Sequence, residues 1–241
     1  LFYMLTPYVQ SKHLLEMPVE KGLILSAIPV VFTSFGFHGS IPSIVKYVGL
    51  DVKVLRKVMI AGAALPLVIY IFWQLLSQGI MSQSDLLNSE GLSGFVASVA
   101  GIAHNSNVSI AVKLFADLAL ATSFLGVSLG LFDFFADAFK QGDNNQGRVI
   151  TALITFIPPL GFALFYPQGF IMALGYAAIA LVVLAVFLPV AMVYKQRAST
   201  SSNTGYKVRS GRTGLLIAAL CGVLIITAQF MQMSGFIPAI G

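Results

Sequence analysis

The sequence predicts an all-α, polytopic membrane helix bundle of about six transmembrane helices, the first of them broken, in a single transmembrane domain over residues 1–241. Three observations favour this fold class. Apolar residues make up 57% of the chain, charged residues make up only 10%, and the mean hydropathy is +0.88. Because a soluble domain carries roughly 25% charged residues, most of this chain is expected to face lipid.

The first two spans follow from long runs without charge. A helix needs about 20 mostly apolar residues to cross about 30 Å of hydrocarbon. Residues 22–45 contain no Asp, Glu, Lys or Arg, so a first span is expected at about 22–46. Residues 58–84 are equally free of charge, and the second span is expected at about 58–80, with Pro66 as its one strong helix breaker.

The third span is less regular. It is expected at about 108–139, although Lys113 and Asp117 precede its most apolar stretch. Residues 91–107, just before it, are rich in Gly, Ser and Asn. This composition is typical of a long loop with short helices.

The last three spans need a turn to fit the bilayer. Residues 149–194 carry no charge, and as one helix they would be roughly 69 Å long, about twice the membrane thickness. Residues 165–170 contain Pro and Gly and are expected to form a turn. This turn gives spans at about 149–166 and 169–194, and a sixth span is expected at about 213–236.

The basic residues indicate how the helices are oriented. Short cytoplasmic loops of membrane proteins accumulate Lys and Arg. Eleven of the fourteen basic residues follow the first, third and fifth spans, namely Lys46, Lys53, Arg56, Lys57, Lys140, Arg148, Lys195, Arg197, Lys207, Arg209 and Arg212. These loops are therefore expected in the cytoplasm, with both chain ends outside. The net charge of +5 then reflects topology, so the expected partner is the lipid bilayer and no nucleic acid.

Prolines and glycines interrupt the first span at the depth of the membrane. Residues 28–43 contain Pro29, Gly36, Gly39 and Pro42, so a continuous helix is not expected. Unpaired amides cost several kcal/mol in hydrocarbon, and irregular backbone at this depth must be buried or line a polar cavity. The sequence therefore predicts a cavity at the break. The alternative is a kinked structural helix with packed aromatic side chains.

Such a break favours binding of an amino acid. In many secondary transporters, released N–H groups and helix ends meet a carboxylate, while released carbonyls meet an ammonium group or a cation. Phe35 and Phe37 flank the break and could offer flat apolar surface to an aromatic side chain.

Two ionisable residues are candidates for proton coupling. His38 is the only ionisable group in the first span, and an imidazole with a reference pKa of about 6.5 suits proton exchange. The alternative is a neutral His38 that hydrogen-bonds the broken backbone. Asp117 could serve a proton path, but near the start of a helix it would also complement the helix dipole.

A mostly small and polar stripe runs along the third span. It is formed at helical spacing by Asp117, Ala121, Phe124 and Ser128. This face is expected to meet other helices. Gly126 and Gly130 form a small-xxx-small pair, which is typical of close helix packing.

Other chemistry is not expected. Ser93, within Gly91 to Gly94, matches a short motif of membrane serine proteases, but its place in a polar loop does not suit a nucleophile that should begin a buried helix. Cys221 is the only cysteine, so the chain cannot form a disulfide or a thiolate metal site of its own. We therefore expect no enzyme activity, no cofactor and no metal.

Three blocks of sequence resemble a known family. They are similar to the broken sixth helix, the eighth helix and the ninth-to-tenth turn of the bacterial aromatic amino acid permeases, and most similar to the tyrosine-specific branch. The blocks are residues 32–43, 114–127 and 163–170.

The resemblance implies an eleven-helix proton symporter of the bacterial inner membrane, with the inverted-repeat fold of amino acid, polyamine and organocation transporters. This chain, which begins at Leu1 without an initiator Met, would supply helices six to eleven. Helices one to five are expected to complete the site.

By the same resemblance, the unwound segment and the eighth helix hold the site. Substrate-binding residues would be Ser34, Phe35, Gly36, Phe37, His38, Gly39 and Phe124. Thr122 and Ser123 occupy positions where related sodium symporters hold their cation, and the candidates for ion or proton coupling are therefore His38, Asp117, Thr122 and Ser123.

The function expected from these observations is proton-coupled import of an aromatic amino acid, with tyrosine favoured. Two alternatives remain open at this point. One is a permease of the same family that prefers tryptophan or phenylalanine. The other is a non-transporting membrane or channel subunit, in which the break only shapes a pore or a packing site.

Overall fold

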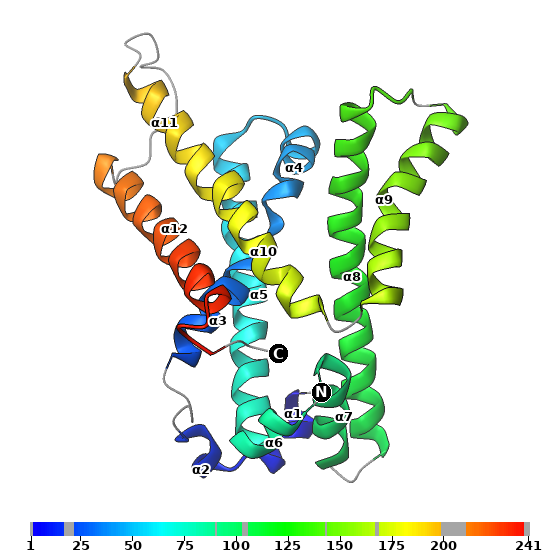
Figure 1. Cartoon of the computed structure of the whole chain (residues 1–241), viewed down its shortest axis with the longest axis vertical. Helices are drawn as coiled ribbons and strands as arrows, with labels where there is room; N and C mark the ends of the chain where they lie inside the picture. The colour runs from blue at the N-terminus through cyan, green and yellow to red at the C-terminus, as the bar shows by residue number, and fades with distance from the viewer. Residues whose placement is uncertain are drawn as a thin grey trace. The chain divides into compact units, whose positions relative to one another are not determined.

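The computed structural model describes residues 2–16, 22–89, 91–102, 106–142, 144–166, 169–198 and 211–238, and these residues form helices and turns without a strand (Figure 1). Six helices are long and apolar enough to cross a membrane, which confirms the predicted number of spans. They are Leu23–Val48, Val52–Ile80, Ser106–Ala138, Asn145–Phe165, Met172–Arg197 and Gly211–Met233.

Two of the six spans are composite. The first is broken, as predicted, into α3 (Leu23–Thr33), a 3-10 turn η2 (Phe37–Ser40) and α4 (Ile41–Val48). The fifth contains a π-helical turn that the sequence did not indicate, and it consists of α10 (Phe170–Val182), η4 (Val183–Phe187) and α11 (Leu188–Ala198).

The other four spans are single helices, namely α5 (Val52–Ile80), α8 (Ser106–Ala138), α9 (Asn145–Phe165) and α12 (Gly211–Met233). Short helices complete the chain, namely α1 (Phe2–Leu5), η1 (Thr6–Tyr8), α2 (Ser11–Leu14), α6 (Gln83–Asn88) and α7 (Gly91–Ile102). The long loop with short helices expected at residues 91–107 is, over the described residues 91–102, the single helix α7, so the expectation that Ser93 lies in a polar loop is wrong.

Local sequence explains where several helices begin and end. Asp51 caps α5, because its carboxylate accepts hydrogen bonds from the N–H groups of Lys53 (2.8 Å) and Val54 (3.2 Å). Asn144 caps α9 in the same way through the Gly147 N–H, at 2.8 Å. α9 ends at Phe165 and α10 begins at Phe170, so the predicted turn at residues 165–170 falls between two helices.

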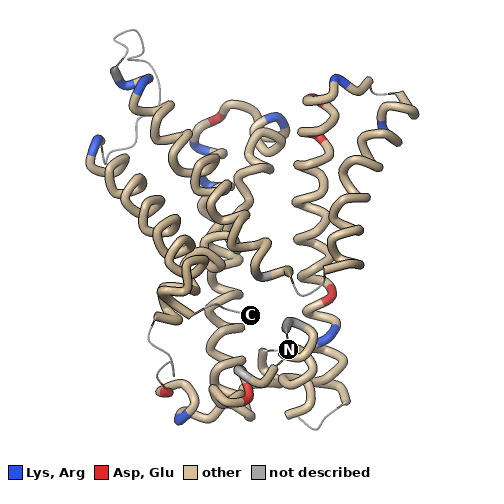
Figure 2. Tube along the Cα trace, in the orientation of Figure 1, with Lys and Arg blue, Asp and Glu red and all other residues tan. Residues whose placement is uncertain are grey.

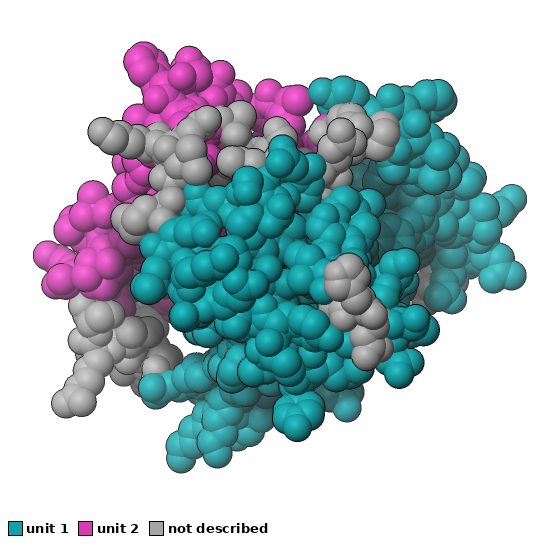
Figure 3. Space-filling view, turned by 90° about the horizontal axis from the view of Figure 1, so that it is seen from below, with its two compact units in different colours: residues 1–19, 39–167 teal, residues 20–38, 168–241 magenta. Residues whose placement is uncertain are grey.

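The chain divides into two compact units, which Figure 3 distinguishes by colour. Unit 1 comprises residues Leu1–Val19 and Gly39–Pro167, and unit 2 comprises Glu20–His38 and Gln168–Gly241. One dividing point therefore falls inside the broken first span, between His38 and Gly39. Each unit is described by itself below.

Unit 1 has its core at the ends of α5, α7 and α8. Buried apolar side chains form this core, namely Leu5, Leu76, Ile80, Met81, Val99, Ala100, Val108 and Val112. Aromatic rings extend it, because Trp73 packs on Phe115 with ring centroids 5.0 Å apart and on Phe95 at 6.2 Å. The long helices α8 and α9 pack on each other as an antiparallel pair.

Hydrogen bonds join the segment from α1 to α2 to the end of α5 and the start of α6. The Gln10 N–H donates to the Gly79 carbonyl at 2.8 Å. Gly79 has no room for a side chain, since a Cβ there would lie 2.6 Å from Val9 Cγ1. Glu16 adds a polar tie, because its carboxylate accepts from the Gln83 N–H at 3.0 Å and lies 3.0 Å from His13 Nδ1.

Unit 2 is built on three mutually packed helices, α3, α10 and α12. Small residues allow this close approach, because a Cβ on Gly222 of α12 would lie 2.7 Å from the Phe187 ring and 3.0 Å from Val182 Cγ1. In the π-turn between α10 and α11, the Leu188 N–H donates to the Val183 carbonyl five residues earlier. Ser26 of α3 is fully buried and donates to the Pro238 carbonyl at 2.7 Å.

Basic residues gather at one end of each unit, as Figure 2 shows. In unit 1 this end contains the last turn of α4, the first turns of α5 and the connection from α8 to α9. In unit 2 it contains the last turn of α11 and the start of α12. Lys207 and Arg209 lie outside the described residues. Within each unit the arrangement agrees with the predicted cytoplasmic loops.

We predict that the Glu16 tie gives a pH-dependent stability. The Gln83 N–H and His13 hold the pKa of the Glu16 carboxyl below its ordinary value of 4.5. A carboxyl with a lowered folded-state pKa stabilises the fold above that ordinary value, and this contribution is lost as the pH falls through the folded pKa. Glu16→Gln should therefore lower the thermal midpoint near neutral pH, and the difference from the parent should vanish in acid.

The measurement is the thermal midpoint of parent and variant in the same detergent between about pH 7 and about pH 3. Asp133→Asn is a suitable control, because this exposed residue has no part in the tie. A Glu16→Gln midpoint that stays below the parent by the same amount at every pH would contradict the assignment.

Candidate functional site

The broken first span ends α3 with local hydrogen bonds. The Ser34 N–H donates to the Val30 carbonyl at 3.2 Å, the Phe35 N–H to Phe32 at 3.2 Å and the Gly36 N–H to Thr33 at 2.9 Å. Two hydroxyls add to these bonds, since Thr33 Oγ1 donates to the Val30 carbonyl and Ser34 Oγ to the Val31 carbonyl, both at 2.7 Å. The carbonyl end of α3 is thus largely satisfied within the segment.

This local pairing changes the expectation from the sequence. Carbonyls released at the end of α3 were expected to meet a guest, but those from Val30 to Thr33 each accept a bond already. A carbonyl has two lone pairs, and the Phe32 carbonyl accepts from the N–H groups of both Ser34 and Phe35. The unwound stretch is also shorter than the expected Ser34 to Gly39, because the chain is helical again from Phe37.

Two residue types keep the break in place. Pro42 at the start of α4 has no N–H to donate. Gly36 fits where a larger residue would not, because a Cβ there would lie 2.9 Å from the Thr33 carbonyl oxygen and 3.4 Å from Leu181 Cδ2 of α10. The break is therefore packed against α10 within unit 2.

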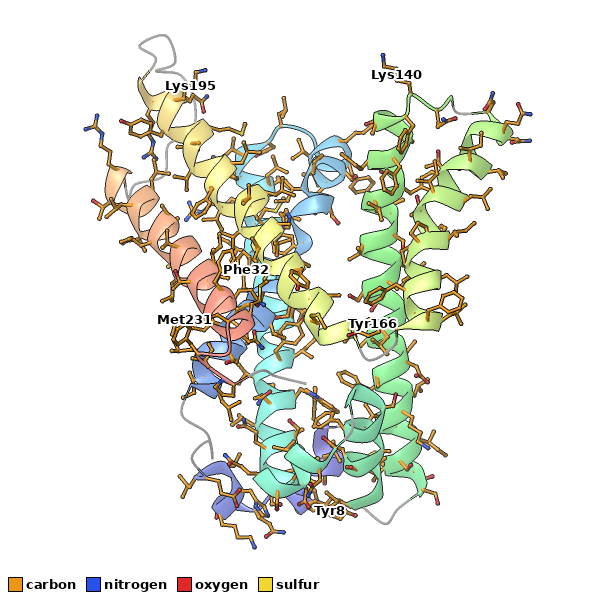
Figure 4. All side chains as sticks on the ribbon, viewed as in Figure 1. Tyr8, Phe32, Lys140, Tyr166, Lys195 and Met231 are labelled. Carbon is orange, nitrogen blue, oxygen red and sulfur yellow. The ribbon has the colours of Figure 1, made fainter. Side chains whose placement is uncertain are left out.

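Three larger side chains project from the break. Phe35 and His38 are half-buried, and Phe37 is exposed. Figure 4 labels Phe32, which lies one residue before the end of α3. An aromatic pair and an imidazole thus follow one another within four residues, on either side of Gly36.

The other predicted site residues lie on α8, in unit 1. Phe124 is 56% exposed, and its ring lies 6.0 Å from that of Phe156 on α9. Thr122 Oγ1 donates to the carbonyls of its own helix, at 2.8 Å to Leu118 and 3.1 Å to Ala119. Asp117 and Ser123 are exposed.

The stripe on α8 was expected to meet other helices, and in the described part of the chain most of it is exposed. Asp117, Ala121 and Phe124 are exposed, and Ser128 is half-buried. Of the glycine pair, only Gly130 has a neighbour, because a Cβ there would lie 3.8 Å from the Gly39 carbonyl oxygen, whereas one on Gly126 would meet nothing within 4 Å.

The structure therefore brings one residue of the break, Gly39, to α8 within unit 1. The contact at Gly130 lies about 12 Å further along the helix than Thr122, at about 1.5 Å per residue. Ser34 to His38 belong to unit 2 and the other α8 candidates to unit 1. Among the described residues, no group of three or more His, Cys, Asp or Glu could hold a metal ion.

The sequence comparisons decide the family. The profile of the tryptophan/tyrosine permease family matches residues 1–229. The chain belongs to this family. The resemblance expected from the sequence is confirmed, and a tryptophan/tyrosine permease is a multi-pass membrane transporter and not an enzyme. No solved structure matches the chain.

Several bacterial permeases are similar over most of the chain. Tyrosine-specific transport system 1 of Haemophilus influenzae is 45% identical over 98% of this chain and 60% of its own length. Tyrosine-specific transport system 2 of the same organism is 35% identical over 99% of the chain and 59% of its own length. The tryptophan-specific transport protein of Haemophilus influenzae is 40% identical over 86% of this chain and 50% of its own length. The chain thus spans about 60% or less of the length of these relatives.

We predict that the break depends on the absence of a side chain at Gly36 and not at Gly39. Gly36→Ala should destabilise the protein by about 1–3 kcal/mol, because the added methyl group would meet the Thr33 backbone. Gly39→Ala is a matched control, since a Cβ there meets nothing within 4 Å.

Both variants should be compared with the parent by thermal unfolding in detergent. Equal losses in the two variants would show that steric fit at Gly36 does not hold the break.

Proposed function

We propose that the protein imports an aromatic amino acid, with tyrosine favoured, across the bacterial inner membrane together with protons. The observation that carries this proposal is a break in an apolar span, between α3 and η2, in a chain of the tryptophan/tyrosine permease family. Irregular backbone at membrane depth is tolerated where it is covered by protein or lines a polar site. A substrate-binding site would account for irregular backbone at this depth.

The chemistry of the break suits an aromatic amino acid. Phe35 and Phe37 lie on either side of Gly36, and their rings could sandwich or flank an aromatic side chain in an offset or edge-to-face arrangement. The Thr33 carbonyl, which accepts from the Gly36 N–H at 2.9 Å, could also accept from the substrate ammonium group, because a carbonyl oxygen has two lone pairs. Phe124 on α8 is proposed as a further aromatic contact.

Tyrosine is favoured over tryptophan and phenylalanine on similarity. The two relatives that align with nearly the whole chain are named as tyrosine-specific systems. A hydroxyl is also the group for which a site can discriminate most strongly, since a buried partner that loses it remains unpaired. Tryptophan and phenylalanine are the competitors that an assay must include.

His38 is the proposed carrier of the coupled proton. It is half-buried in the broken span, and ionisable residues within membrane spans are rare and usually functional. Asp117 is a second candidate, and Thr122 and Ser123 are proposed to contact the ion or proton path. Because the relatives are longer than this chain, helices that precede this part of the fold are proposed to complete the site and to cover the exposed stripe on α8.

We predict saturable uptake of labelled tyrosine by the full-length protein in cells that lack their own aromatic permeases. Because uptake would be driven by the proton gradient, an uncoupler should abolish accumulation. Unlabelled tyrosine should compete better than tryptophan or phenylalanine. Conductance without saturation would instead favour a channel, and saturable uptake that an uncoupler does not affect would refute proton coupling.

We predict that His38→Asn separates binding from coupling. Asparagine can still hydrogen-bond but cannot titrate, so concentrative uptake should fall at least about tenfold if one proton-coupled step is lost, while tyrosine binding persists. His13→Asn is the control, because His13 lies in α2, outside the six spans, and its uptake is compared at equal amounts of folded protein since it also loses the contact with Glu16. Equal uptake and equal pH dependence in His38→Asn and the parent would refute the role of His38.

A further inference from the structure

Among the described residues of unit 2, one buried polar side chain has an oxygen without a hydrogen-bond partner. Gln229, in the second-last turn of α12, is only 5% exposed. Among the described residues its Oε1 receives no hydrogen bond. A buried amide oxygen without a donor costs about 1–3 kcal/mol, and in native structures such groups are almost always satisfied by protein or by ordered water.

The amide group lies against a glycine that has no room for a side chain. A Cβ on Gly175 of α10 would lie 2.5 Å from Gln229 Nε2 and 2.9 Å from both Oε1 and Cδ. Gly175 itself is buried. The absence of a side chain at Gly175 therefore leaves space on α10 for the Gln229 amide. An apolar side chain at position 229 could fill the core without burying a polar group.

The surroundings are built from three helices of the same unit. α3, α10 and α12 pack on one another, and the buried residues next to Gln229 along the helices are small or apolar, namely Ala228 and Ile225 on α12 and Ala178 on α10. None of these side chains can donate a hydrogen bond. The donor that Gln229 Oε1 lacks must come from another source.

The place is close to the helix ends. Gln229 lies four residues before the end of α12, and Gly175 lies five residues after the start of α10. At about 1.5 Å per residue, both are about 6–8 Å from those ends. Ser26, whose hydroxyl is buried and bonded to the Pro238 carbonyl, lies three residues after the start of α3. A small polar molecule could reach this depth from the interface.

We propose that Gln229 and Gly175 form a binding site for a single water molecule within the packing of α3, α10 and α12. The water donates one hydrogen to Gln229 Oε1 and the other to a backbone carbonyl, which has a second lone pair available. Such a water satisfies the amide at little entropic cost. The water also links α12 to α10. Because Leu181 of α10 is the neighbour of Gly36, this link stabilises the helices that position the break.

Gln229→Met tests the site, because methionine has nearly the same shape but cannot accept this bond. If Oε1 is unpartnered in the protein, its removal relieves a desolvation cost, so the thermal midpoint should stay the same or rise. If a water is bound, the midpoint should fall by about 2 °C or more. Gln232→Met, in the same helix but only half-buried, is the matched control and should change little.

The direct measurement is an experimental map of the complete protein at a resolution that shows ordered water. Density should lie about 2.5–3.0 Å from Gln229 Oε1 and should be absent in Gln229→Met. An empty position, a protein donor at that position, or a Gln229→Met midpoint at or above the parent would each overturn the proposal. Should the variant not accumulate, the map of the parent protein decides alone.

Discussion

The need to pair every backbone N–H and C=O group in hydrocarbon governs this structure. Each unpaired group would cost several kcal/mol, so the six apolar spans are helical. At the break after α3, the backbone groups form hydrogen bonds within the next few residues. The N–H groups of residues 34–36 donate to carbonyls in the last turn of α3. The hydroxyls of Thr33 and Ser34 also donate to carbonyls of this turn. A break that is closed this tightly presents mainly its side chains, which makes Phe35, Phe37 and His38 the proposed determinants of recognition.

Spans and turns were predictable because they depend on local composition. Long apolar runs, free of charge except in the third span, predicted six spans, which is the number that the described residues form, and the excess length of residues 149–194 required a turn within residues 165–170. The break was predictable because proline and glycine act on their own backbone. The helix α5 begins at Val52, before the charge-free run that starts at Val58, since the cap formed by Asp51 extends the helix over three basic residues.

Features that depend on contacts between distant residues could not be predicted. The π-turn has no residue signature, and the pair of Gln229 and Gly175 joins positions 54 residues apart. The glycine pair on α8 shows the limit well, because the motif correctly indicated a close approach at Gly130 but not that Gly126 would face open space. Small residues in the sequence indicate which face of a helix can pack closely. The segment that packs there is known only from the folded structure.

The π-turn Val183–Phe187 accommodates one residue more than regular winding would. Side chains of α11 are therefore displaced around the helix axis by roughly 100° relative to an uninterrupted continuation of α10. A helical wheel drawn through the whole fifth span would assign the wrong α11 side chains to lipid. Deletion of one residue within this turn would restore even α-helical winding and shorten the span by only about 1.5 Å, and the same side of α11 would remain turned to α12.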